Sequence, residues 1–188
     1  RRHTARDIRE AFCTAREGDF ACINMDLIAG LPQDSVEGFR DSLEEVLALR
    51  PENITVHTLA MKKGSRLMEE GGALPSGEET ARMVDLSLEA LEGAGYRPYY
   101  LYRQKYMSGG LENVSWCLPG TENHYNIIMM EELQSVLSLG AGGVTKLVDR
   151  SSGRIVRLTN PKYPHDYLAM SAKVLEQKDE ILRFYREV

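Results

Sequence analysis

Residues 23–32 constrain the fold of this chain more than any other part of its sequence. They form a strongly apolar run that carries one carboxylate, Asp26, and ends abruptly in Gly-Leu-Pro. Apolar residues on both sides of Asp26 predict a β-strand that is buried on both faces, as in a parallel sheet. A lone charge in such a strand is costly unless something pairs with it. No cationic residue lies nearby in sequence, so we expect the partner to be a ligand, or a distant arginine or backbone amide.

Helix and strand patterns alternate on either side of this strand. Thr4 can cap a helix that Gly18 ends, and a second helix is expected to begin at Asp34 and to stop at Pro51. Residues 54–59 predict the next strand. A strand–helix–strand unit has a right-handed crossover and parallel strands. The first part of the chain is therefore predicted to belong to an α/β barrel or to an open, doubly wound sheet.

The remainder of the chain, after Gly64, shows a different pattern. Its polar, glycine-rich stretch is predicted to be a long loop, and such loops in compact domains are often functional. Two β-rich runs around a tight turn predict a hairpin, and leucines at every seventh position mark the last helix. The expected elements are a helix over 76–93, a strand over 96–102, a loop over 103–126, a helix over 127–139, a β-hairpin over 144–158 and a helix from residue 164.

The composition argues against several classes of protein. The net charge of −5 and the lack of a dense Lys/Arg block argue against duplex nucleic acid as the main partner. No apolar run approaches the roughly 20 residues of a membrane span, and no signal peptide is evident, so a cytoplasmic protein is expected. Cys13, Cys22 and Cys117 lack metal-ligand spacing, so we expect small buried side chains and no metal site on this chain. Because the sequence opens with Arg1, we expect a piece of a longer protein.

Several further residues are candidates for a site, and each has a structural alternative. His57 lies inside a strand pattern, where a satisfied core histidine is favoured over a general base without an evident partner. Ala60 follows that strand, where the backbone could meet a ligand. The glycine-rich residues 139–146 lack the glycine that a phosphate loop needs before its lysine, so they predict a tight turn. Arg103 and Lys105 suit an anionic small molecule, with a solvated loop or single-stranded nucleic acid as alternatives.

Four motifs, in this order along the chain, resemble a known family. Together they are similar to the oxygen-independent coproporphyrinogen III oxidases, which are radical S-adenosylmethionine enzymes. Residues 100–105, Tyr-Leu-Tyr-Arg-Gln-Lys, resemble the branch called coproporphyrinogen dehydrogenases in Gram-positive bacteria. The motifs are Asn-Met-Asp-Leu-Ile-Ala-Gly-Leu-Pro at 24–32, Pro-Glu-Asn-Ile-Thr-Val-His at 51–57, Gly-Tyr-Arg-Pro-Tyr-Tyr-Leu-Tyr-Arg-Gln at 95–104 and Gly-Ala-Gly at 140–142.

The resemblance implies an α/β fold with two domains. Residues 1–64 would be the last helix and strand units of a partial (β/α)6 TIM-like barrel, and residues 65–188 a smaller C-terminal α+β domain. In this family a [4Fe-4S] cluster is held by three cysteines near the start of the barrel. Those cysteines have no counterpart in this chain, so the resemblance implies that the cluster and S-adenosylmethionine are cofactors of a longer parent protein.

The resemblance also implies roles for particular residues. Asp26 matches the family aspartate that contacts S-adenosylmethionine at the end of the fifth strand. Ala60 matches the sixth-strand residue whose backbone touches a second such molecule. Arg1 falls where the family has an arginine for the cofactor's carboxylate, and Lys146 falls on another cofactor contact.

The implied reaction is the oxidative decarboxylation of two propionate side chains of coproporphyrinogen III, which yields protoporphyrinogen IX. Arg103 and Lys105 are expected to bind the carboxylates of this tetrapyrrole substrate, and the fragment alone is expected to be inactive. A haem-binding chaperone or carrier of the same family is the alternative, with an unrelated barrel enzyme as a third possibility. The strand edge of an incomplete barrel also predicts self-association.

Overall fold

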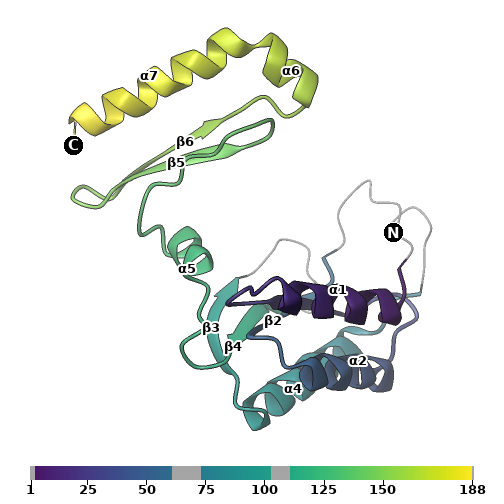
Figure 1. Ribbon diagram of the computed structural model, residues 1–188. Helices are drawn as coiled ribbons and strands as arrows, with labels where there is room; N and C mark the ends of the chain where they lie inside the picture. The colour runs from purple at the N-terminus through teal and green to yellow at the C-terminus, as the bar shows by residue number, and fades with distance from the viewer. Residues whose placement is uncertain (1–2, 61–72, 103–110, 188) are drawn as a thin grey trace. The chain divides into compact units, whose positions relative to one another are not determined.

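The structure is a computed structural model that describes residues 3–60, 73–102 and 111–187. The chain forms two compact units, Arg1–Asn123 and His124–Val188, whose elements are shown in Figure 1. The expected domain boundary after residue 64 lies outside the described residues and stays a prediction. Among the helices that the structure describes, none has both the length and the apolar character of a membrane span.

The first unit is built around a four-stranded mixed sheet in the order β1-β2-β4-β3. Strands β1 and β2 are parallel, so the predicted strand–helix–strand unit is confirmed. The other two pairings are antiparallel. The expected loop over 103–126 is wrong in part, because it contains β4, which lies inside the sheet. The elements are α1 (Ala5–Glu17), β1 (Asn24–Ala29), α2 (Val36–Leu49), β2 (Asn53–Thr58), α4 (Gly77–Gly93), β3 (Arg97–Tyr102) and β4 (Asn113–Cys117).

The helices of this unit begin where the sequence predicts. Thr4 forms a capping box at the start of α1, and Ser76 does the same for α4. The side chain of Ser35 accepts the backbone N–H of Gly38 at the start of α2. Each cap satisfies a backbone N–H group that has no partner inside the helix. Helix α2 ends at Leu49, and its C-cap residue Arg50 precedes a proline.

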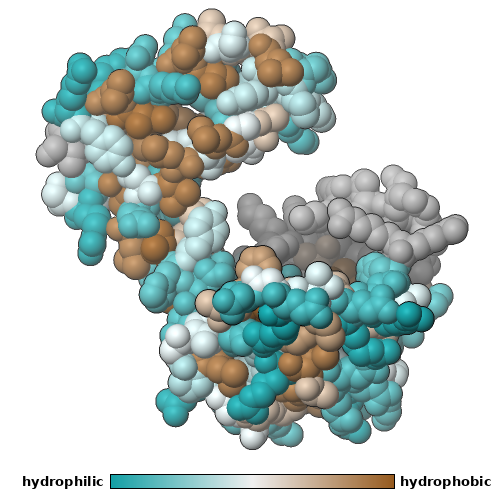
Figure 2. Space-filling model, viewed as in Figure 1, coloured by the Kyte–Doolittle hydropathy of each residue, from teal (hydrophilic) through white to brown (hydrophobic). Residues whose placement is uncertain are grey.

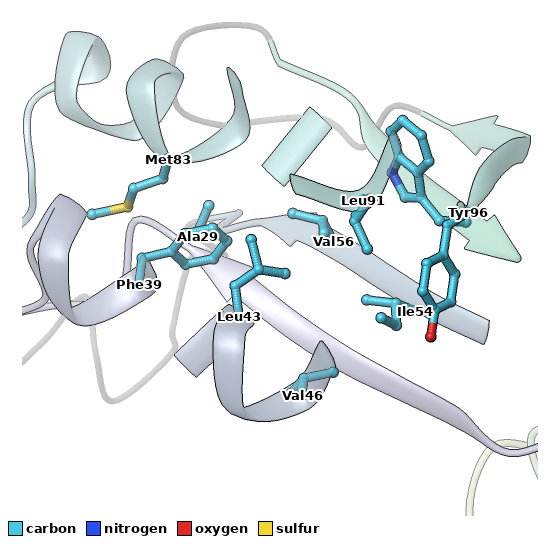
Figure 3. Close-up of a cluster of buried hydrophobic side chains, with 10 residues drawn as sticks. Ala29, Phe39, Leu43, Val46, Ile54, Val56, Met83, Leu91 and Tyr96 are labelled. Atoms are coloured by element: carbon cyan, nitrogen blue, oxygen red, sulfur yellow. The ribbon is translucent and has the colours of Figure 1, made fainter. Parts of the chain in front are cut away.

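Alternating side chains give the sheet two different faces. One face is apolar and packs against α2 and α4, which lie together on one side of the sheet in Figure 1. The opposite face, called the polar face below, carries Asn24, Asp26, Asn53, Thr55, His57, Tyr100, Tyr102, Asn113 and Ser115. The core between sheet and helices, drawn in Figure 3, consists of Ala29, Phe39, Leu43, Val46, Ile54, Val56, Met83, Leu91, Tyr96 and Trp116.

Strand β1 is not buried on both faces, which corrects the first prediction. Its residues alternate between exposed and half-buried, and only Ala29 is buried. Among the described residues β1 pairs with β2 alone, and its polar side chains point away from the helices. Asp26 is consequently 58% exposed.

The second unit is a β-hairpin packed against the last helix. Its small core consists of Leu147, Leu158 and Phe184, and the predicted hairpin is confirmed. The helix expected over 127–139 is wrong beyond residue 130, where a turn and an isolated bridge at Val136 replace it. The elements are α5 (His124–Met130), β5 (Val144–Asp149), β6 (Arg154–Thr159), α6 (Pro164–Ala169) and α7 (Ser171–Glu187).

The regularly spaced leucines of the last segment do not form its buried side. Leu168, Leu175 and Leu182 are 76%, 58% and 56% exposed, because Ile181 and Phe184 contact the hairpin instead. Figure 2 shows apolar side chains gathered on the visible surface of this unit. Exposed apolar surface of this kind favours association with another surface, and self-association stays a prediction.

The turn after β1 gives a first testable prediction. Gly30 has a φ of +84°, and an added Cβ would lie 3.1 Å from both Cγ2 and Oγ1 of Thr80. We expect Gly30→Ala to lower the free energy of unfolding by about 1–3 kcal/mol, as measured by urea unfolding. Gly77→Ala is the matched control, because a Cβ there meets nothing within 4 Å. An equal loss in both variants would contradict the prediction.

Candidate functional site

A hollow of about 380 Å³ opens on the polar face, at the carboxyl ends of β1 and β2. Ligands of α/β proteins bind at this end of parallel strands. The volume falls within the range of about 300–1,000 Å³ that small-molecule sites occupy. The hollow is lined by Asp26, Ile28, His57, Thr58, Leu59, Ala60, Tyr102 and Asn113.

One oxygen of the Asp26 carboxylate is held by a row of polar side chains. Asn24 Nδ2 donates a 2.6 Å hydrogen bond to Asp26 Oδ1. Thr55 Oγ1 in turn donates to Asn24 Oδ1 at 3.1 Å and lies 2.8 Å from Ser115 Oγ. The register of β1, β2 and β4 places these residues side by side. The row therefore fixes the side chain of Asn24 and, through it, the orientation of Asp26.

The other oxygen of the carboxylate faces His57. His57 Nε2 lies 3.6 Å from Asp26 Oδ2, and His57 Nδ1 lies 3.1 Å from the hydroxyl of Tyr102. The interactions with His57 and Asn24 lower the pKa of Asp26 below its ordinary value, although burial opposes them. Asp26 is therefore ionised at neutral pH. The expectation of a core histidine is wrong, because His57 lies outside the buried core, lines the hollow and has its partners on β1 and β3.

One aromatic side chain of β3, Tyr102, lines the hollow and stacks on a second, Tyr100. The rings of Tyr100 and Tyr102 are stacked, with 5.7 Å between their centroids and 8° between their planes. Burial and the neighbouring Tyr102 raise the pKa of Tyr100, so its phenol stays protonated. Because Tyr102 also lines the hollow, the site combines one anionic group with an aromatic surface.

The structure brings two of the expected cofactor-binding residues together. Asp26 and Ala60 come from β1 and from the residue pair after β2, and both line the hollow. Three other residues that the sequence singles out for ligand binding, Arg1, Arg103 and Lys105, lie outside the described residues.

Lys146 lies in the second unit and has partners there. Its Nζ donates a 2.7 Å hydrogen bond to the carbonyl oxygen of Met129 and lies 3.7 Å from Glu132 Oε1. Arg157 also binds Glu132, at 2.5 Å. The buried Lys146 thus links strand β5 to the segment before the hairpin, and its expected contact with a cofactor stays a prediction.

The part of the chain that the structure describes contains no group of three or more His, Cys, Asp or Glu side chains that could hold a metal ion. The expected burial is correct for Cys117 and wrong for Cys13 and Cys22, which are exposed. Burial raises the pKa of the Cys117 thiol to about 11, so it stays protonated.

Comparison with known proteins gives no matching family model but several relatives. The chain is 38% identical to the oxygen-independent coproporphyrinogen-III oxidase-like protein HemZ of Bacillus subtilis; the match covers all of this chain and 37% of HemZ. It is 33% identical to the oxygen-independent coproporphyrinogen III oxidase of Pseudomonas aeruginosa, over 52% of this chain and 22% of that protein. It is 24% identical to the haem chaperone HemW of Haemophilus influenzae, over 88% of this chain and 40% of HemW.

A solved structure supports the same relationship at the level of the fold. Coproporphyrinogen III oxidase (HemN) from Escherichia coli, a radical SAM enzyme, matches with a TM-score of 0.62 and 19% identity, over 87% of this chain and 37% of that chain. The chain thus spans a little over a third of the length of HemZ and of HemN. These matches, together with the four motifs, show that the chain belongs to the family of the oxygen-independent coproporphyrinogen III oxidases and their relatives.

Proposed function

We propose that the chain is the C-terminal part of a radical S-adenosylmethionine protein that acts on a tetrapyrrole. In this proposal residues 1–64 complete a partial (β/α)6 barrel, residues 65–188 form the smaller domain, and the hollow binds S-adenosylmethionine. The supporting observation is that Asp26 and Ala60, which the resemblance assigns to a first and a second molecule of this cofactor, come from different parts of the chain and line one hollow.

The residues of the hollow fit S-adenosylmethionine in charge and in aromatic character. An ionised carboxylate accepts hydrogen bonds from ribose hydroxyls or an amino group and stabilises a nearby sulfonium. Asp26 is such a carboxylate and is half-exposed, so it can reach a ligand. The ring of Tyr102 offers an aromatic surface to a flat group such as adenine.

When bound, S-adenosylmethionine and a reduced [4Fe-4S] cluster supply the one-electron chemistry that removes hydrogen from the substrate. The described residues contain no group for such a cluster, so its ligands are proposed to lie in the rest of the parent protein. The chain's own residues bind and orient: Asp26 holds the cofactor, and the stacked tyrosines form an apolar wall that limits the access of water.

The proposed reaction is the oxidative decarboxylation of two propionates of coproporphyrinogen III to vinyl groups, with Arg103, Lys105 and Lys146 as proposed ligand-binding residues. A second candidate is a haem-binding chaperone or carrier. It is supported by the similarity to HemW, which extends over 88% of this chain. The two candidates share the fold and differ in whether the tetrapyrrole is changed.

The test uses the full-length protein, reconstituted under anaerobic conditions. We expect conversion of coproporphyrinogen III to protoporphyrinogen IX only when S-adenosylmethionine is present, as followed by chromatography of the oxidised porphyrins. The double variant Arg103→Ala/Lys105→Ala should lower kcat/KM about 10- to 100-fold, because charge-assisted contacts to carboxylates are lost. Arg97→Ala, an exposed cation on β3, is the matched control and should change nothing.

A parallel titration with haem separates the two candidates. Tight, stoichiometric haem binding without product formation would favour the carrier. The absence of both turnover and haem binding would contradict both candidate functions. Unchanged kcat/KM in the double variant would remove Arg103 and Lys105 from the proposal and leave the reaction itself in place.

A further inference from the structure

The carboxylate of Asp26 accepts a hydrogen bond at one oxygen and faces a histidine ring at the other. Asn24 occupies Oδ1 at 2.6 Å, and His57 faces Oδ2 at 3.6 Å. Asp26 itself is 58% exposed on a strand with no described neighbour on its outer side. An exposed aspartate ordinarily samples several rotamers. These two contacts therefore restrict the directions in which its oxygens can point.

The ring of His57 is itself oriented by Tyr102. The phenol lies 3.1 Å from Nδ1, and the two rings meet edge to face at 71°, with 6.2 Å between centroids. When the Tyr102 hydroxyl donates to Nδ1, the neutral imidazole carries its proton on Nε2. That N–H then points to the carboxylate of Asp26. The opposite tautomer would place a lone pair against the negative oxygen.

The position of His57 in the sheet argues against a role in packing. It lies on the polar face, away from the core that α2 and α4 form with the apolar face. Its side chain is 26% exposed and lines the hollow. The 3.6 Å separation from Asp26 exceeds direct hydrogen-bond distance, and contacts of this length commonly tighten when a ligand binds.

We infer that His57 is a positioning residue: its Nε2–H aims the Asp26 carboxylate into the hollow, and Tyr102 fixes the tautomer that allows this. The inference rests on the proposed function, because it assigns His57 a part in holding S-adenosylmethionine through Asp26. It adds His57 on β2 and Tyr102 on β3 to the cofactor contacts that the resemblance names, which are Asp26, Ala60, Arg1 and Lys146.

The test measures the Kd for S-adenosylmethionine by equilibrium dialysis with the full-length reconstituted protein. We expect His57→Ala to raise this Kd about tenfold. His57→Gln keeps an N–H donor, so its Kd should lie within about threefold of that of the parent protein. Added imidazole should restore part of the affinity of His57→Ala, because the hollow is open to solvent. Tyr102→Phe should lower the affinity for S-adenosylmethionine about threefold. His165→Ala, which removes a 3.0 Å contact with Asp166 in the second unit, should change nothing.

The outcomes separate this inference from the proposed function. Normal affinity in His57→Ala, together with weakened binding in Asp26→Asn, would overturn the role of His57 and leave the cofactor site in place. Normal affinity in Asp26→Asn would overturn the cofactor site itself. A loss in His57→Ala that neither glutamine nor imidazole relieves would assign the ring a packing role and overturn the inference. If His57→Ala fails to fold, the affinities of His57→Gln and Tyr102→Phe still test the positioning role of His57.

Discussion

Replacing Asp26 with asparagine is expected to weaken binding of S-adenosylmethionine about 10- to 100-fold in the full-length protein and to leave its fold intact. Asparagine keeps the shape of the side chain and removes its charge. A hydrogen bond to a charged group contributes about 1.5–3 kcal/mol, so the loss of one such contact gives a change of this size. Since Asp26 is 58% exposed and lies on the face of the sheet opposite the core, the thermal stability of the protein should change little. Isothermal titration calorimetry measures the affinity.

Asp85→Asn is the control for this prediction. Asp85 is exposed on α4, which packs on the opposite face of the sheet, so its loss should leave the affinity unchanged. Equal effects in the two variants would indicate that overall charge governs binding. Unchanged affinity in Asp26→Asn would contradict the placement of the cofactor at this hollow.

The pH dependence of binding follows from the same contacts. The pKa of Asp26 is lowered in the folded protein, chiefly by His57 and also by Asn24. The carboxylate therefore stays charged as pH falls below its ordinary pKa of about 3.9, and this group should give a flat affinity between pH 5 and 8. The contribution of Asp26 to binding is lost only as pH falls through its lowered pKa. Replacing His57 raises the pKa of Asp26 again, so the decline in affinity should begin at a higher pH, provided that the protein remains folded.

The secondary structure near the site was largely predictable from local signals. Capping serines mark the starts of α2 and α4, because they satisfy backbone groups that the helix cannot, and Pro51 marks the end of α2. Strand β4 was missed, since its five residues follow a polar, glycine-rich stretch and show little alternation. Its strand character depends on pairing with β2 and β3, which are far away in sequence. No local pattern contains that information.

The sequence singles out Asp26 as the central residue of the site, but it does not predict which side chains lie next to Asp26. A carboxylate inside an apolar run already sets Asp26 apart, because its charge needs a partner. Its partners depend on register: Ile28 pairs with His57, which brings the ring beside Asp26, and Tyr102 pairs with Asn113. A shift of one residue would turn every side chain to the other face. The contact between His57 and Tyr102 therefore becomes visible only in three dimensions.

The second large effect is expected in the core that supports the site. Leu43 is fully buried, and Figure 3 shows it directed from α2 into the cluster beneath β1 and β2. Leu43→Ala should lower the free energy of unfolding by about 3–5 kcal/mol, because it removes buried methyl groups and leaves a cavity. Urea unfolding followed by the fluorescence of Trp116, the only tryptophan of the chain, reports on this same cluster.

Leu101→Ala is the matched control for Leu43→Ala. Leu101 lies on β3 in the same unit and is 57% exposed, so the same truncation should cost less than about 1 kcal/mol. Because α2 packs against the strand that carries Asp26, a destabilised core should also weaken the site. Leu43→Ala is thus expected to lower cofactor affinity only under conditions in which the unit begins to unfold, whereas Asp26→Asn lowers it in the fully folded protein. Equal unfolding free energies for the two leucine variants would contradict the assignment of this cluster as the main core of the unit.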